Sequence, residues 1–223
     1  MSCITKYKDY RIGYFLVDVL VDNRLLIELK ATPTLRPIHE AQLLAYLHVS
    51  NLSLGILVNF GGQNIIFKRF ANTVEKPSYE ETGKLNTPIS DNFPYPELRT
   101  DLIAVLNEVR QHIKPGFMHM HYRRATQFEL RLHGIPFELK KKIIIMFHQQ
   151  PLQEKETRLL IVDDKVILTP VAVRGITFAM KNRLRYYLNL LGLEVGIIAN
   201  FHTPHLEIET VTKYDRIQPK MTL

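Results

Sequence analysis

Apolar runs separated by short polar turns dominate the first 30 residues of the chain. Residues 15–21 are apolar except for Asp18, residues 22–24 have the polar composition of a turn, and residues 25–30 form a second apolar run. Two such runs joined by three polar residues predict a β-hairpin.

A helix and two more strands are predicted after this hairpin. Residues 38–50 have Ala41, Leu44, Ala45 and Leu47 spaced for one helical face. Residues 54–60 have the composition of a buried strand, and residues 64–70 form the next strand after a Gly-Gly turn.

The second half of the chain opens with two predicted helices. Residues 98–113 carry an apolar stripe at helical spacing, and residues 117–133 follow a Pro-Gly break. Beyond them, strands are predicted over residues 142–148, 158–162 and 165–168. Residues 71–97 contain four prolines among polar residues, so we predict a linker there.

One sequence string occurs twice. Tyr-Leu-x4-Leu-x2-Gly-Ile-x2-Asn-Phe begins at Tyr46 and again at Tyr187, and every position is displaced by 141 residues. Identical spacing predicts two copies of one structural unit. The second copy follows two predicted helices that have no counterpart before the first, so we expect the first copy to begin at its first strand.

Composition places the chain among globular proteins. It has 223 residues, of which 46% are hydrophobic and 23% are charged, which is enough for a packed core and excludes disordered and collagen-like classes. No apolar run is long enough for a membrane span, and the first ten residues do not resemble a signal peptide. The single cysteine, Cys3, forms no internal disulfide. We expect a soluble, cytoplasmic protein that does not contact a membrane.

The formal net charge of +7 is concentrated between residues 99 and 142. This basic stretch could face a polyanion such as nucleic acid, or it could form an ordinary solvated surface.

Candidate chemistry lies on the predicted hairpin. A three-residue turn pairs Val21 with Leu25 and therefore places Asp18 opposite Glu28, while Glu28 and Lys30 share one face of their strand. Two neighbouring carboxylates repel each other unless a cation lies between them, and Mg²⁺ or Mn²⁺ takes such hard oxygen ligands. A simple ion pair with Lys30 is the alternative.

Two polar residues follow on the next helix. Gln42 and Tyr46 are four residues apart and so share one helical face, from which they could bind a phosphate or orient a nucleophile.

The order Asp, Glu-x-Lys, Gln-x3-Tyr resembles the PD-(D/E)XK nuclease superfamily and, more closely, its GxxExxY family of small bacterial proteins. The matching segments are residues 17–21, 27–31, 39–47 and 54–60. The resemblance implies an α/β protein of two PD-(D/E)XK-like units, each a mixed β-sheet flanked by helices. We expect residues 1–72 to form a unit without its front helix, residues 73–97 a linker, and residues 98–223 a second unit.

The resemblance also implies a nuclease mechanism. Asp18, Glu28 and the backbone carbonyl of Leu29 would bind Mg²⁺ or Mn²⁺, and the ion would activate a water against DNA or RNA. Lys30 would position that water or neutralise the transition state. Gln42 and Tyr46 would hold the phosphate backbone.

The second copy has lost these residues. The displacement of 141 replaces Asp18 by Leu159, Glu28 by Thr169, Lys30 by Val171 and Gln42 by Arg183, and only Tyr46 keeps its counterpart, Tyr187. The family's name-giving motif falls on residues 116–122, with His119 at the position of the glutamate. The second unit is therefore expected to be a catalytically inactive scaffold.

Two alternatives stay open. The chain could be a non-catalytic nucleic-acid-binding or assembly protein that retains a nuclease fold. It could also be an enzyme that needs another chain's helix. We expect the helices of residues 98–133, a homodimer or a partner protein to complete the core of the first unit.

Overall fold

The structure is a computed structural model that describes residues 2–72, 93–113, 115–147, 150–203 and 205–214. Its two mixed sheets, each flanked by helices, confirm the predicted α/β class. The predicted linker lies mostly outside the described residues, so the proposed division at residues 72 and 98 stays a prediction.

The first sheet has the strand order β3-β4-β5-β6, and a separate two-stranded hairpin precedes it. Its elements are β1 (Ser2–Tyr7), β2 (Tyr10–Leu16), β3 (Val19–Val21), β4 (Leu25–Lys30), α1 (Pro37–Ser50), β5 (Leu54–Asn59) and β6 (Ile66–Ala71).

The second sheet has the order β11-β10-β9-β8-β7. The second half of the chain contains α2 (Pro96–His112), α3 (His119–Leu132), β7 (Phe137–Phe147), β8 (Gln150–Val162), β9 (Val166–Val171), α4 (Phe178–Leu191), β10 (Val195–Asn200) and β11 (Glu207–Thr212). Strands β7 and β8 are longer than predicted because they pair with each other over almost their full length.

The predicted hairpin of the first sheet is present, with Val21 paired to Leu25. The predicted apolar face of α1 is partly wrong. Leu43 and Tyr46 are buried, whereas Ala41 and Leu44 are exposed. The reason lies in β5, where Gly55 has no Cβ and leaves room for Leu43; a Cβ there would lie 3.0 Å from Leu43 Cδ1.

Equivalent strands of the two sheets pair in the same register. Leu25 pairs with Leu54 in β4 and β5, and the residues displaced by 141, Val166 and Val195, pair in β9 and β10. The same displacement relates the pairing of β5 with β6 to that of β10 with β11. The repeated sequence string therefore has the same backbone structure in both halves.

A buried asparagine stabilises the same loop in each half. Asn59 Oδ1 accepts a hydrogen bond from the Thr32 amide at 3.0 Å, and its Nδ2 donates to the Thr32 carbonyl at 2.8 Å. Asn200 makes the same pair of bonds to Val173, at 3.0 and 2.9 Å. The asparagine and glycine of the string thus fix the backbone rather than the chemistry.

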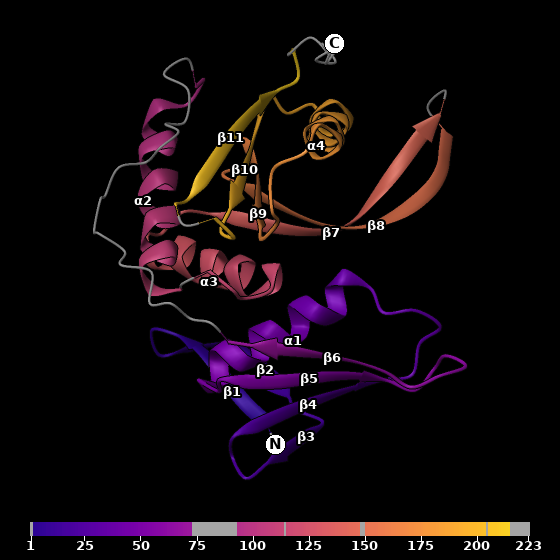
Figure 1. The fold of residues 1–223 in the computed structure, drawn as a ribbon. Helices are drawn as coiled ribbons and strands as arrows, with labels where there is room; N and C mark the ends of the chain where they lie inside the picture. Colours follow the sequence, from indigo (N-terminus) through magenta and orange to yellow (C-terminus); the bar gives the residue numbers. More distant parts are fainter. Residues whose placement is uncertain (1, 73–92, 114, 148–149, 204, 215–223) are drawn as a thin grey trace, which may run out of the picture.

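The two halves differ in the residues just before the first strand of the first sheet, β3. Val17 and Asp18 interrupt the strand between β2 and β3, whereas β8 runs without interruption through the equivalent residues Arg158 and Leu159. As a result the β1–β2 hairpin packs on α3, while the outer part of β7 and β8 extends away from the body (Figure 1).

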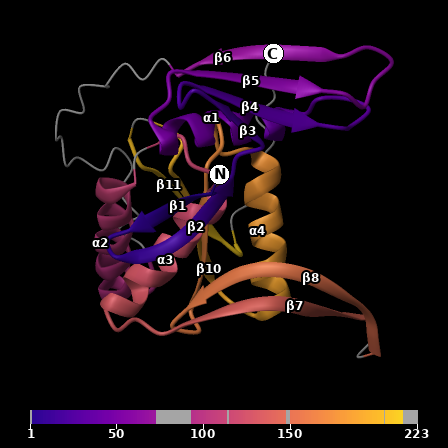
Figure 2. The ribbon, with the colours of Figure 1, turned by 90° about the horizontal axis from the view of Figure 1, so that it is seen from below.

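Helix α3 lies between the halves of the molecule. Figure 1 shows the first sheet, α1, α3, the second sheet and α4 stacked in that order, and Figure 2 shows the β1–β2 hairpin across α3. Tyr7 and Ile12 of the hairpin belong to the same buried cluster as α2, α3 and the second sheet. The helices predicted over residues 98–133 therefore contact both halves.

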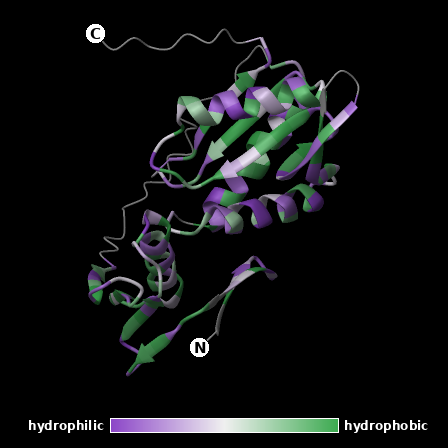
Figure 3. Cartoon of the chain, turned by 90° about the vertical axis from the view of Figure 1, so that its right-hand side faces the viewer, coloured by the Kyte–Doolittle hydropathy of each residue, from purple (hydrophilic) through white to green (hydrophobic). Residues whose placement is uncertain are grey.

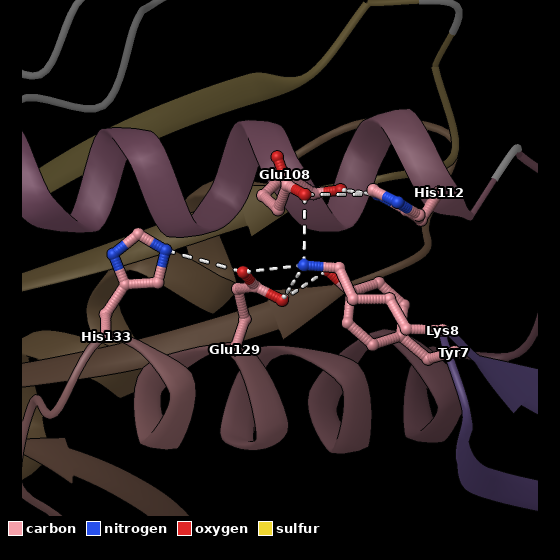
Figure 4. A network of polar contacts seen from close by, with 6 residues as sticks. All are labelled: Tyr7, Lys8, Glu108, His112, Glu129 and His133. Atoms are coloured by element: carbon pink, nitrogen blue, oxygen red, sulfur yellow. Dashed lines mark hydrogen bonds and ion pairs between the residues drawn. The ribbon is translucent and has the colours of Figure 1, made fainter.

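A buried carboxylate joins the hairpin to the helices. Glu129 of α3 accepts a hydrogen bond from the Tyr7 hydroxyl at 2.7 Å and two from Lys8 Nζ at 3.1 Å each (Figure 4). Lys8 Nζ also lies 3.0 Å from Glu108 of α2. Burial alone would raise the pKa of Glu129, but the hydrogen bonds from Tyr7 and Lys8 outweigh burial and lower it.

One face of the first sheet is not covered. The strands of both sheets are largely apolar (Figure 3), and α1 covers only one face of the first. On the other face Leu54 is 41% exposed and Phe67 64%, whereas the equivalent Val195 and Ile208 are 0% and 2% exposed beneath α2 and α3.

Among the helices of the described residues, none is both long enough and apolar enough to cross a membrane.

We expect Glu129→Gln to lower the free energy of unfolding by about 2–4 kcal/mol at pH 7, because the substitution removes the buried charge that pairs with Lys8. A group whose pKa is lowered in the folded state stabilises the fold above its unfolded pKa and loses that effect as the pH falls. The difference between wild type and variant should therefore shrink in acid. Thermal denaturation followed by circular dichroism measures it, with the exposed Asp101→Asn on α2 as the control. Equal melting of wild type and Glu129→Gln would contradict this account.

Candidate active site

Asp18 lies at the interruption between β2 and β3 rather than inside a strand. Its Oδ2 accepts a hydrogen bond from the amide of Leu29 at 2.8 Å. Val19 and Ile27 are the last paired residues of the β3–β4 hairpin. Asp18 precedes Val19 and Glu28 follows Ile27, so the two acids are neighbours just beyond that pair. The interruption frees the Asp18 backbone from sheet pairing and lets its carboxylate lie beside β4.

Glu28 is at the centre of the polar group. It is 2% exposed, and its Oε1 accepts hydrogen bonds from Lys30 Nζ at 2.6 Å and from Gln42 Nε2 at 2.8 Å. Its Oε2 is buried and has no hydrogen-bond partner among the described residues. A buried carboxylate oxygen without a partner is costly, so a bound cation or water at this atom would be stabilising.

Gln42 joins the strand to the helix. Its Oε1 accepts from Lys30 Nζ at 3.1 Å, and its Nε2 donates to the Tyr46 hydroxyl at 2.6 Å. Four of the sequence-predicted side chains, Glu28, Lys30, Gln42 and Tyr46, therefore form one hydrogen-bonded chain. Asp18 joins this chain through the backbone of Leu29.

The electrostatics of the group favour an added cation. Burial raises the pKa of Glu28, the Lys30 ammonium partly offsets this, and the negative charge of Asp18 raises it further. Burial also raises the pKa of Tyr46, and the charges of Glu28 and Asp18 add to the effect. The single ammonium of Lys30 thus does not fully compensate the two carboxylates.

The residues fit a hard divalent cation with few protein ligands. Within the described part of the chain, no three His, Cys, Asp or Glu side chains form a metal-binding group. Mg²⁺ is commonly held by one or two carboxylates and several waters, and the unpartnered Glu28 Oε2 beside Asp18 matches that pattern. Zinc, which needs four convergent nitrogen or sulfur ligands, does not match.

Three residues near the site were not predicted from the sequence. His39 is buried on α1, where burial and the charges of Lys30 and Arg36 lower its pKa. Met120 and Arg124 of α3 line a groove of about 250 Å³ together with Tyr46. No signal in the sequence connects Arg124 with Tyr46, because they meet only after the two halves pack.

The equivalent residues of the second half also converge, but with different chemistry. Leu159, Thr169, Val171, Arg183 and Tyr187 all line one cavity between α3, α4 and the second sheet. None of them is an acid. The second half therefore retains the place of the site without its carboxylates.

Comparison with known proteins gives one match. A family model described as the PD-(D/E)XK nuclease superfamily matches residues 2–70 and 96–211. No curated protein matches the chain, and no solved structure does.

We expect Lys30→Met to lower the free energy of unfolding by about 2–4 kcal/mol at neutral pH, because it leaves the buried Glu28 without its counter-ion. Lys68→Met is the matched control. It removes an ion pair with Glu40 of the same 2.6 Å length, but that pair is exposed and should contribute less than about 1 kcal/mol. Chemical denaturation of both variants measures the difference, and equal losses would contradict the burial argument.

Proposed function

The chain belongs to the PD-(D/E)XK nuclease superfamily, and from that premise we propose that its first half is a divalent-metal-dependent nuclease that hydrolyses phosphodiester bonds of DNA or RNA. The observation that carries the proposal is the buried, unpartnered Oε2 of Glu28 beside Asp18. Lys30 and Gln42 hold the other oxygen of the same carboxylate, so Glu28 is oriented before any ligand binds.

Asp18, Glu28 and the Leu29 carbonyl would hold Mg²⁺ or Mn²⁺, which supplies a water of lowered pKa and stabilises charge on the phosphate. Lys30 orients the Glu28 carboxylate and places a positive charge next to the reacting phosphate. Tyr46 would direct its hydroxyl toward the phosphate backbone, and Gln42, whose two N–H groups donate to Glu28 and Tyr46, would hold both side chains in place. Burial of Glu28 strengthens its interactions with Lys30 and Gln42.

We also propose that the chain is a tandem pair of units of the GxxExxY type, over residues 1–72 and 98–223, acting in the cytoplasm. The common register of the two sheets and the paired asparagine bonds support the duplication. In the second unit α3 begins at His119, the position of the family's glutamate.

A non-catalytic nucleic-acid-binding protein is the second candidate. It is favoured by the 2.6 Å contact between Lys30 Nζ and Glu28 Oε1, because a retained ion pair alone would produce the same geometry. Metal binding separates the two candidates.

Wild-type protein should bind Mn²⁺ or Mg²⁺ in isothermal titration calorimetry, and Glu28→Gln should abolish binding because the amide is a poor ligand for a hard cation. The matched control is Glu40→Gln, which neutralises an exposed acid of α1 that pairs with Lys68. The same variants in a cleavage assay with labelled DNA and RNA should show a loss of about a hundredfold or more for Glu28→Gln. Metal binding that survives in Glu28→Gln would remove the basis of the nuclease proposal.

The uncovered face of the first sheet belongs to the same proposal. Its exposed large apolar side chains are Val19, Val21, Leu29, Leu54 and Phe67, with Arg69 of β6 as a charged residue among them. Monomeric proteins rarely leave a large contiguous apolar patch uncovered. We propose that a second copy of the chain covers this face, since a largely apolar sheet face complements itself in a twofold dimer.

Light scattering after size exclusion should therefore give the mass of a dimer. Phe67→Glu should convert it to a monomer, because it places a charge on this face. Leu44→Glu on α1 is the control, since Leu44 is also exposed but lies on the other side of the sheet. A monomeric wild type would rule out the second copy and leave a different partner protein as the occupant.

A further inference from the structure

The second half of the chain contains a cavity of about 890 Å³ at the place that corresponds to the candidate active site. All five residues displaced by 141 from Asp18, Glu28, Lys30, Gln42 and Tyr46 line it. Glu28 of the first half is 2% exposed, whereas its counterpart Thr169 lines a cavity that contains none of the counterpart acids. The second half thus has a concave site rather than a filled core at this place.

The cavity is strongly basic. Its charged lining residues are Arg123, Arg124, Lys141, Lys142, Arg158 and Arg183, with Glu156 as the one acid among them. Lys142 pairs with Glu154 at 2.6 Å, but Arg123, Arg158 and Arg183 form no ion pair with any described acid. A cluster of uncompensated guanidinium groups in a cavity is typical of anion recognition.

Arg123 shows the excess of positive charge in this cavity most clearly. It is half-buried on α3, and its Nε is buried without a hydrogen-bond partner among the described residues. Burial lowers the pKa of Arg123, and the neighbouring positive charges of Arg158 and Arg124 lower it further. The fold therefore holds like charges together here at a cost that a bound anion would offset.

The cavity shares one lining residue with the groove of the first half. Arg124 lines the basic cavity and also the groove that contains Tyr46 and Met120. Its Nη1 donates to the Ile12 carbonyl at 2.8 Å, which fixes the side chain between the two halves. A chain of phosphates could therefore pass from one depression to the other along α3.

We propose that this basic cavity binds phosphate groups of the nucleic-acid strand whose neighbouring phosphodiester is presented to Glu28. The inference rests on the proposed function for the identity of the strand. The cations come from α3, the β7–β8 pair and α4, a spread that fits several phosphates in succession better than one free nucleotide. In this view the second unit has exchanged catalysis for substrate binding.

The test is equilibrium binding of fluorescein-labelled single-stranded DNA and RNA, followed by fluorescence anisotropy in EDTA so that no cleavage occurs. The double variant Arg158→Ala/Arg183→Ala should bind at least tenfold more weakly than wild type. The slope of log K against log salt should become shallower by about 1 to 2, because two phosphate contacts are lost.

Lys181→Ala is the matched control. It removes one positive charge from α4, two residues from Arg183, but Lys181 pairs with Glu209 and does not line the cavity. Its affinity should stay within about twofold of wild type, because a lysine that is paired with Glu209 and lies outside the cavity contacts no phosphate. Equal losses in Lys181→Ala and Arg183→Ala would overturn the assignment, since net charge alone would then explain binding.

Two features of the test distinguish this inference from its alternatives. Strand binding is measured on the wild type in EDTA, where neither metal nor cleavage contributes, so that failure of the nuclease proposal leaves the binding result intact. Inorganic phosphate or a mononucleotide that competes at micromolar concentration would overturn the choice of a strand as ligand.

The melting temperature separates a binding role from a structural one. Because Arg158 and Arg183 are exposed and unpaired among the described residues, the double variant should melt at the wild-type temperature or above it. Weaker binding together with a lower melting temperature would show that the cations hold the fold, and would overturn the inference.

Discussion

The chain has only one helix pair, α2 and α3, to cover the second faces of two sheets, and most of the structure depends on that constraint. A mixed sheet with apolar side chains on both faces needs cover on both faces. Helices α1 and α4 each cover one face, and α2 with α3 cover the remaining face of the second sheet. The first sheet therefore obtains only the attachment of its β1–β2 hairpin to α3, and its other face stays open.

The two halves show how one backbone carries two kinds of chemistry. Register, turn and the buried asparagine are the same in both. The two places differ in the side chains at five equivalent positions, in the residues that surround them and in the interruption before Asp18. In the first half a buried acid is balanced by Lys30 and Gln42. In the second, neutral residues and Arg183 occupy those positions, and the surrounding arginines find no counter-charge among the described residues.

The sequence predicted local geometry well because strand alternation and helical spacing are short-range properties. The turn that pairs Val21 with Leu25, the shared face of Glu28 and Lys30, and the contact of Gln42 with Tyr46 all follow from such spacing. Whether these residues carry catalysis stays a prediction.

What the sequence did not predict depends on packing between distant segments. Tyr7 donates a hydrogen bond to Glu129, which is 122 residues further along the chain. No pattern in the sequence of β1 predicts this contact. The basic stretch of residues 99–142 was visible as a charge excess. Its convergence with Arg158 and Arg183 required the fold.

The interruption at Val17 and Asp18 has one more consequence. The same two residues release the Asp18 carboxylate toward β4 and turn the preceding hairpin onto α3. In the second half, where β8 is continuous, neither event occurs. In this fold the position of the Asp18 carboxylate and the attachment of the two halves thus depend on the same interruption of the strand.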